Sequence, residues 1–325
     1  MEEIKFIDLF CGIGGFRIGM DEACKENDIK PTCVFSSDID KFCQDSYLVN
    51  FGHRPMGDIT SIDPKSIPDH DVLFAGFPCQ PFSIIGQMKG FEDTRGTLFF
   101  HLAAIIKEKR PKAFILENVK QLVGHNGGQT LQVILKTLQD LGYTVFQKVL
   151  NALDFGLPQK RERIIIVGHL DPIYFSFPTP VRPYRSLNEI LETKVEPKFY
   201  TSEYIKEKRS VSHKSAHKLS IWHENKSGNI TSYPYSCALR AGASYNYLLV
   251  NGERRLTPRE MFRLQGFPDW YKIVANDGQA RRQAGNAVPV NLVKSVILKL
   301  LPHLSVVLDS NMVLAESETA YALNQ

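Results

Sequence analysis

Short apolar runs alternate with longer amphipathic segments over residues 4–170 of the chain. The short runs are rich in β-branched and aromatic residues and predict six strands: Ile4–Phe10, Cys33–Asp38, Asp71–Gly76, Ala113–Val119, Tyr143–Ala152 and Arg163–His169. Apolar residues at helical spacing predict four helices between them: Phe16–Lys25, Lys41–Phe51, Leu98–Lys109 and Gln129–Leu141. This alternation is typical of an α/β fold with a doubly wound, mostly parallel sheet and helices on both faces.

The pattern changes after about Asp171, where four prolines lie close together. We expect a linker there, followed by a small lobe over Arg185–Arg254 that is irregular or β-rich, with no clear helix before Pro258. A further apolar helix over Asn291–Leu301 is expected to pack back on the first sheet. The predicted organisation is a main domain from residues 1–184 and 281–325, a small domain from 185–254 and a connecting segment from 255–280.

Composition and charge narrow the class of protein. Of 325 residues, 43% are apolar and 23% are charged, which is enough to bury a full core. No apolar run approaches the length of a membrane span and no signal peptide is evident, so we expect a cytoplasmic protein with no membrane contact. The six cysteines contain no CxxC pair, which argues against a disulfide framework or a zinc ribbon. The net charge of +4 and a basic stretch at Lys206–Lys218 are compatible with nucleic-acid binding.

A glycine-rich turn, CGIGG at residues 11–15, follows the first predicted strand and precedes a helix. Such glycines let the backbone approach a ligand, or simply let a helix pack closely on a strand. Asp38 ends the second strand beside this turn, where a carboxylate could accept from ribose hydroxyls. Asp58 could accept from an adenine amino group or could cap a helix. Because no phosphate-binding GxxxxGK[ST] loop is present, the pattern favours a nucleoside derivative without a polyphosphate, such as S-adenosylmethionine.

Cys79 lies in a loop directly after the third predicted strand, between Pro78 and Pro81. A lone cysteine is usually an inert core residue. Here the two prolines restrict the backbone and favour an exposed, reactive thiol at the ligand-binding edge of the sheet.

A carboxylate is expected near this thiol, with one of Gln159, Arg161 and Arg163 to orient it or to contact a carbonyl oxygen. Glu117 ends the next strand at the same edge, where a carboxylic acid could protonate or hydrogen-bond a ring nitrogen. Alternation directs Gln159, Arg161 and Arg163 to one side if that segment is extended, although a solvated strand end is the simpler alternative. A thiol, an acid and an arginine together suit methylation of carbon 5 of a pyrimidine, because thiolate addition at carbon 6 makes carbon 5 nucleophilic.

These motifs together resemble those of bacterial DNA cytosine-5 methyltransferases of the type found in restriction-modification systems. The ordered segments that carry the resemblance are FIDLFCGIGG, GDIT, GFPCQPFS, ENV, QKRERI, RLTPREMFRLQGFP and QAGNAVPV. They span the chain almost end to end. The resemblance implies a Rossmann-like domain that uses S-adenosylmethionine, a target-recognition domain, and methyl transfer to a cytosine flipped out of double-stranded DNA that lies between the two domains.

The resemblance also implies roles for individual residues. Cys79 would be the nucleophile, Glu117 the partner of cytosine N3 and Arg163 the contact to the cytosine oxygen. We add Arg161 and Asn118 to the catalytic group. The cofactor contacts that we expect are Phe10, Gly12, Gly14, Gly15, Asp38, Ile39, Asp58, Ile59, Pro78, Leu98, Asn286 and Ala287. The DNA contacts that we expect are Gln80, Ser83, Arg95, Ser236, Arg240 and Tyr245.

Two positions depart from the family's pattern. Ile39 stands where an aromatic residue often covers the adenine, and Ala238-Leu239 stands where Thr-Leu is usual. We expect weaker stacking at the adenine with retained binding, and the loss of a hydroxyl near a DNA phosphate. Sequence choice is expected within Ser232–Leu248, whose polar donors suit base readout, although its tyrosines could instead pack the lobe. Gln80–Thr97 is either a loop that closes over DNA or an ordinary surface loop.

Three alternatives stand beside this interpretation. A transfer-RNA cytosine methyltransferase would share the fold, but that branch usually varies the Pro-Cys-Gln loop, which is intact here. An inactive homologue is disfavoured because Cys79, Glu117 and Arg163 are all present. A metal site could be formed by His213, His217, His223 and Glu224. Neighbouring lysines disfavour it, and we expect no metal. We expect a monomer, with any cognate restriction endonuclease encoded separately.

Overall fold

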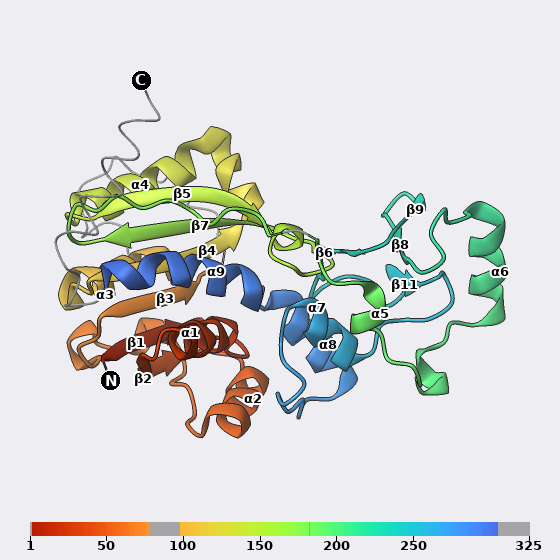
Figure 1. Ribbon diagram of the computed structural model, residues 1–325, viewed down its shortest axis with the longest axis horizontal. Helices are drawn as coiled ribbons and strands as arrows, with labels where there is room; N and C mark the ends of the chain where they lie inside the picture. The colour runs from red at the N-terminus through yellow and green to blue at the C-terminus, as the bar shows by residue number, and fades with distance from the viewer. Residues whose placement is uncertain (1, 79–97, 182, 305–325) are drawn as a thin grey trace.

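The computed structural model describes residues 2–78, 98–181 and 183–304. Its main region is a six-stranded sheet in the order β2-β1-β3-β4-β7-β5, with a smaller lobe beside it (Figure 1). The strands of the sheet are β1 (Glu3–Leu9), β2 (Lys30–Ser37), β3 (Val72–Gly76), β4 (Ala113–Val119), β5 (Thr144–Asn151) and β7 (Glu162–His169). Only β7 runs antiparallel to its neighbours, β4 and β5, so the expected mostly parallel sheet is confirmed.

Alternate residues of the central strands supply two separate cores. In β1, Phe6 packs into the core under α1 and α9, whereas Ile7 packs into the core under α3 and α4. Residues of α9 lie against α1 in the first core, as expected for a late helix that packs back on the sheet (Figure 1). The helices of this region are α1 (Gly15–Glu26), α2 (Lys41–Phe51), α3 (Leu98–Lys109), α4 (Gln129–Asp140) and α9 (Val290–Leu300). All the strands and helices predicted for this region are therefore present, with small shifts at their ends.

The smaller lobe has an antiparallel sheet in the order β11-β8-β9 and two helices. Its elements are α5 (Leu187–Ile190), α6 (Glu203–Ser212), β8 (Ile221–Glu224), β9 (Ile230–Tyr233), β10 (Ser236–Cys237) and β11 (Leu248–Val250). β10 pairs with β6 (Gln159–Lys160) and thereby joins the lobe to the main region.

The expectation of no clear helix before Pro258 is wrong. α5 is a single turn closed by a capping box between Ser186 and Glu189. α6 is polar, and the residue that it buries is Arg209, so it has no apolar stripe by which sequence reasoning could have found it.

Two helices return the chain to the main region, α7 (Pro258–Leu264) and α8 (Asp277–Asn286). The predicted boundary between residues 280 and 281 falls within α8, which continues past it to Asn286. Short 3-10 helices complete the described elements: η1 (Ile59–Ser61), η2 (Pro64–Ser66), η3 (Lys120–Val123), η4 (His125–Gly128), η5 (Ala152–Asp154), η6 (Pro197–Phe199) and η7 (Leu301–His303).

The helical run Asp277–His303, which includes α8 and α9, is long and apolar enough to cross a membrane by length and composition. Within its apolar window, however, 67% is buried inside the protein. That burial is typical of a core helix, and the contact with α1 accounts for it.

Candidate active site

A cavity of about 740 Å³ lies at the edge of the sheet where β1, β2, β3 and β4 end. The turn before α1, the end of α8 and residues 239–242 of the smaller lobe complete its walls. Because carboxyl ends of parallel strands meet at one edge, segments far apart in sequence converge here. The expected site residues that line the cavity are Phe10, Gly12, Gly15, Asp38, Ile39, Asp58, Ile59, Pro78, Leu98, Glu117, Asn118, Arg161, Arg163, Arg240, Asn286 and Ala287.

Asp38 organises one side of the cavity. Its carboxylate accepts hydrogen bonds from the backbone N–H of Gly12 at 2.7 Å and of Asp40 at 2.8 Å. Burial raises the pKa of this carboxyl above its ordinary value. Each carboxylate oxygen can accept further hydrogen bonds, so the group can also receive ribose hydroxyls. Gly12 has a φ of 54°, and a Cβ there would meet nothing within 4 Å, which leaves open space above the turn.

Two further residues bear on the fit of a nucleoside. Ile39 follows Asp38 and exposes 72% of its surface beside the cavity, as suits a side chain that covers an adenine face. One oxygen of Asp58 accepts from the backbone N–H of Thr60 at 2.9 Å and caps η1. The cap is thus real, and the contact of Asp58 with adenine stays a prediction.

Gly14 is not among the residues that line the cavity. It has a φ of 81°, and a Cβ there would lie 2.3 Å from the ring of Phe51. A left-handed backbone and close packing therefore explain this glycine without a ligand.

Glu117 and Arg163 form an ion pair on the other side of the cavity. Arg163 Nε lies 2.7 Å from Glu117 Oε1, and both side chains are largely buried. The reversed direction of β7 explains the pairing, because the start of β7 lies beside the end of β4, with Arg163 opposite Val119 in the register. Glu117 also pairs in register with Gly76 at the end of β3, three residues before Cys79. Four predicted site residues, Cys79, Gln80, Ser83 and Arg95, lie outside the described residues.

Arg161 and Asn118 hold backbone around the cavity. The guanidinium of Arg161 donates to the carbonyl oxygens of Leu239 (2.8 Å), Gly285 (2.9 Å) and Ala287 (2.8 Å). Burial lowers the pKa of Arg161 to about 9, which leaves it charged at neutral pH. Asn118 Nδ2 donates to the carbonyl of Phe77 at 2.9 Å and fixes the end of β3.

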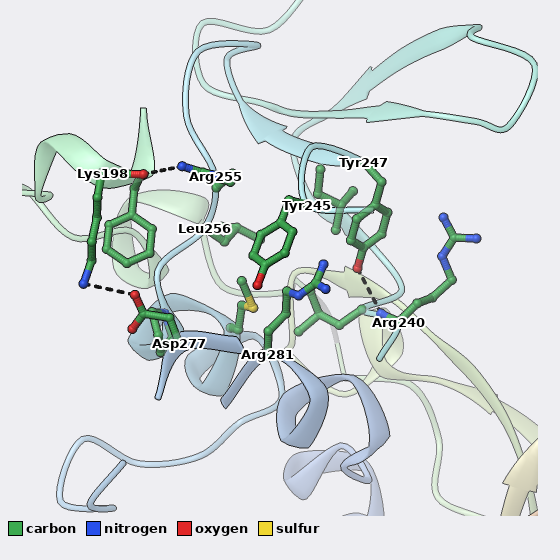
Figure 2. Close-up of a pocket in the computed structure, with 13 residues that line it drawn as sticks. Lys198, Arg240, Tyr245, Tyr247, Arg255, Leu256, Asp277 and Arg281 are labelled. Atoms are coloured by element: carbon green, nitrogen blue, oxygen red, sulfur yellow. Dashed lines mark hydrogen bonds and ion pairs between the residues drawn. The ribbon is translucent and has the colours of Figure 1, made fainter. Parts of the chain in front are cut away.

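The predicted DNA contacts that the structure describes differ in exposure. Arg240 is exposed and lines the cavity. Tyr245 lies beside a second cavity of about 220 Å³, which Arg240 also lines (Figure 2). Ser236 is buried, and its hydroxyl donates to the carbonyl of Cys237.

The histidines weighed as metal ligands do not converge. His213 is hydrogen-bonded to Ser232 at 2.8 Å and lies edge-on to Trp222. Within residues 2–78, 98–181 and 183–304, no group of three or more His, Cys, Asp or Glu side chains could hold a metal ion.

Sequence reasoning missed several residues of the cavity. Gln283 of α8 is buried, and its Nε2 donates to the carbonyl of Phe42 at 2.9 Å and to the hydroxyl of Ser46 at 3.0 Å. It therefore ties α8 to α2 beside Asp38. Ala241 and Gly242 also form part of the wall. Gln283 opens the QAGNAVPV segment, and Ala241 and Gly242 lie within Ser232–Leu248. Both segments had been singled out in the sequence, but no feature of these three residues indicated that they line the cavity.

The chain is similar to known proteins in both sequence and fold. Residues 4–301 match the family described as C-5 cytosine-specific DNA methylase. The chain is 58% identical over 295 residues to the type II methyltransferase M.NgoBI of Neisseria gonorrhoeae, covering 90% of this chain and 91% of that relative. It is 54% identical to the type II methyltransferase M.HaeII of Haemophilus aegyptius, covering 94% of this chain and 95% of that relative. A solved structure with the same fold is the Dnmt2 methyltransferase of S. pombe, with a TM-score of 0.71 and 21% identity over 93% of this chain and 99% of the other.

Proposed function

The chain belongs to the C-5 cytosine-specific DNA methylase family, and on that premise we propose how its residues carry out the reaction. It is an S-adenosylmethionine-dependent enzyme that methylates carbon 5 of cytosine in DNA. The observation that carries the proposed roles is the Glu117–Arg163 ion pair, placed at the strand edge that leads to Cys79. The high identity to type II DNA methyltransferases favours DNA over the transfer-RNA alternative.

The cofactor half of the cavity fits S-adenosylmethionine. We propose that Asp38 receives the ribose hydroxyls and that Ile39 covers the adenine. The open space above Gly12 supports this arrangement. Asp58, Asn286 and the other expected cofactor contacts that line the cavity complete the proposed set, which leaves out Gly14. When bound there, S-adenosylmethionine supplies an electrophilic methyl group. We propose no metal, because the chain's own thiol and carboxyl can activate the ring.

The catalytic half acts on a cytosine that has left the DNA stack. The Cys79 thiolate adds to carbon 6 of the ring, and Glu117 hydrogen-bonds or protonates N3, which moves electron density to carbon 5. Arg163 fixes the Glu117 carboxyl and contacts the cytosine carbonyl oxygen. After methylation, loss of the carbon 5 proton expels the Cys79 thiolate and restores the aromatic ring.

Covalent trapping tests the nucleophile. DNA with 5-fluorocytosine at the target should form a stable adduct with the enzyme and cofactor, because fluorine cannot leave as a proton does. Cys79→Ser should form none, whereas Cys33→Ser, which changes a half-buried thiol of β2 that does not line the cavity, should react like the wild type. An adduct with the Cys79→Ser protein would show that another group is the nucleophile.

We propose that sequence choice resides within Ser232–Leu248 and that Arg240 reads a base. Its side chain is exposed, and a guanidinium can bind guanine bidentately. Ala238 supplies no hydroxyl, so Ala238→Thr should be tolerated or should improve DNA affinity.

A substitution of Arg240 tests this assignment. Arg240→Ala should relax or abolish site choice without changing cofactor affinity. Lys226→Ala, which removes an exposed charge from the same lobe, serves as the control. Sequencing of methylated sites measures both variants, and an unaltered pattern and rate in Arg240→Ala would remove Arg240 from base readout.

The wider setting is proposed from the family. The protein acts as a monomer in the bacterial cytoplasm on double-stranded DNA, and any cognate restriction endonuclease is encoded separately. Phosphate contacts should make DNA affinity fall steeply with salt while cofactor affinity changes little.

A further inference from the structure

The turn that carries Arg240 is attached to α8 by one arginine. We define residues 240–247 as the recognition turn. Arg281 of α8 donates from Nη1 to the carbonyl oxygens of Ala243 at 2.8 Å and Ser244 at 3.2 Å. Its guanidinium also lies 4.2 Å from the ring centroid of Tyr245, a cation–π distance. One side chain thus holds both the backbone and an aromatic ring of the turn.

Tyr245 is held from a second direction. Figure 2 shows its ring between Arg281 and Arg255, whose guanidinium is 5.9 Å from the ring centroid. Arg255 donates to the carbonyl of Lys198, and the Lys198 ammonium lies 3.0 Å from Asp277 at the start of α8. The aromatic ring is therefore fixed, even though 56% of its surface is exposed.

The far end of α8 approaches the same turn even more closely. A Cβ at Gly285 would lie 2.4 Å from the backbone nitrogen of Ala241, so backbone packs directly on helix there. Inside the turn, the backbone N–H of Arg240 donates to the hydroxyl of Tyr247 at 2.9 Å. The backbone of the turn is thus fixed at several points. The Arg240 side chain is exposed, and its guanidinium lies 4.9 Å from the ring centroid of Tyr247.

We propose that Arg281 is a positioning residue for DNA sequence choice: by fixing the recognition turn on α8, it presents Arg240 to a base in one orientation. This inference rests on the proposed function, in which Arg240 reads sequence. Discrimination between bases needs donors held to a fraction of an ångström, and a turn ordered before binding loses less entropy on binding. The physical effect of Arg281 is therefore on the choice between sites and on DNA binding.

Three variants test the proposal against wild-type enzyme. The measurement is the ratio of kcat/KM for the preferred duplex site to that for a duplex changed at one base, together with cofactor affinity. Arg281→Ala should lower this ratio about ten-fold, equivalent to about 1.4 kcal/mol, and raise KM for DNA more than it lowers kcat. The ratio for Arg281→Lys should lie between those of the wild type and Arg281→Ala, because lysine keeps a cation near Tyr245 but loses the planar fork of the guanidinium. Arg282→Ala, which removes the next, exposed charge of α8, should keep the wild-type ratio.

The outcomes separate this proposal from the one on which it rests. A wild-type ratio in Arg281→Ala, or an equal fall in Arg282→Ala, overturns the role of Arg281. Unchanged cofactor affinity shows that a variant is folded. If Arg281→Ala loses cofactor affinity, Arg281→Lys decides the question. A wild-type ratio in Arg281→Lys then overturns the positioning role of Arg281. If Arg240→Ala retains site choice, the placement of base readout is wrong; if Arg240→Ala relaxes it and Arg281→Ala does not, only the positioning role fails.

Discussion

Replacing Arg161 by lysine keeps a buried positive charge but removes the planar fork that serves three carbonyl oxygens. The two terminal nitrogens of Arg161 point in different directions, one toward Leu239 and the other toward Gly285 and Ala287. A lysine ammonium occupies a single point, so it leaves one or two of these acceptors without a donor. Because Arg161 is fully buried, water cannot replace the lost bonds.

The size of the effect follows from these contacts. A buried acceptor left without a donor costs about 1–3 kcal/mol, so one or two of them should lower the free energy of unfolding by about 1–6 kcal/mol in Arg161→Lys. Leu239, whose carbonyl accepts from Arg161, directly precedes the recognition turn. We therefore expect KM for DNA to rise, because that turn loses an anchor.

Urea unfolding followed by circular dichroism measures the stability change, and steady-state methylation measures kcat and KM. Lys160→Ala, at the exposed neighbouring position, should change neither. If Arg161 instead acts on the cytosine itself, kcat should fall steeply while the free energy of unfolding stays at the wild-type value. That combination would refute the argument from the three carbonyl contacts.

Two other predictions concern the cofactor side. Asp38→Ala should weaken S-adenosylmethionine binding by about 1–3 kcal/mol, measured by calorimetry on the free protein, because it removes the proposed ribose acceptor and the support of the Gly12 N–H. An unchanged Kd would leave Asp38 a structural role only. Asp8 lies fully buried under the site, and burial raises its pKa well above the ordinary value. The folded protein therefore holds a proton that the unfolded chain releases, so stability should fall as pH rises from about 4 toward the folded pKa. In Asp8→Asn, the free energy of unfolding should fall less over this pH range than in the wild type, because asparagine does not titrate. Denaturant unfolding at several pH values measures this, and identical pH profiles for the two proteins would contradict the prediction.

The sequence predicted the main sheet and many of the residues that line the cavity for one physical reason. Buried strands have compact apolar runs, and residues such as Asp38 and Glu117 end those runs, so they meet at one edge whatever the details of packing. The direction of β7 could not be predicted in this way. Apolar periodicity does not depend on strand direction, so the pattern could not show that Arg163 begins its strand beside Glu117.

The helix α8 shows a second limit. Its buried face is formed by Ala280, Gln283, Ala284 and Gly285, so no large apolar residue marks a stripe. Its closeness to the recognition turn depends on the absence of a side chain at Gly285, a feature that appears only when both backbones are placed. The role of Arg161 was similarly hidden, because its acceptors are carbonyl oxygens contributed by segments far away in sequence.

The return of the chain through α9 means that no single cut in the smaller lobe divides the protein into its two regions. A break in the exposed turn between β8 and β9, near Ser227, would yield one fragment with all six strands of the main sheet and another with α9. The second fragment would carry Leu292, Val296 and Leu300, which belong to the same buried cluster as Phe16 of α1. An enzyme divided at this turn would therefore have to reassemble through the buried contact between α1 and α9, because neither fragment contains both helices.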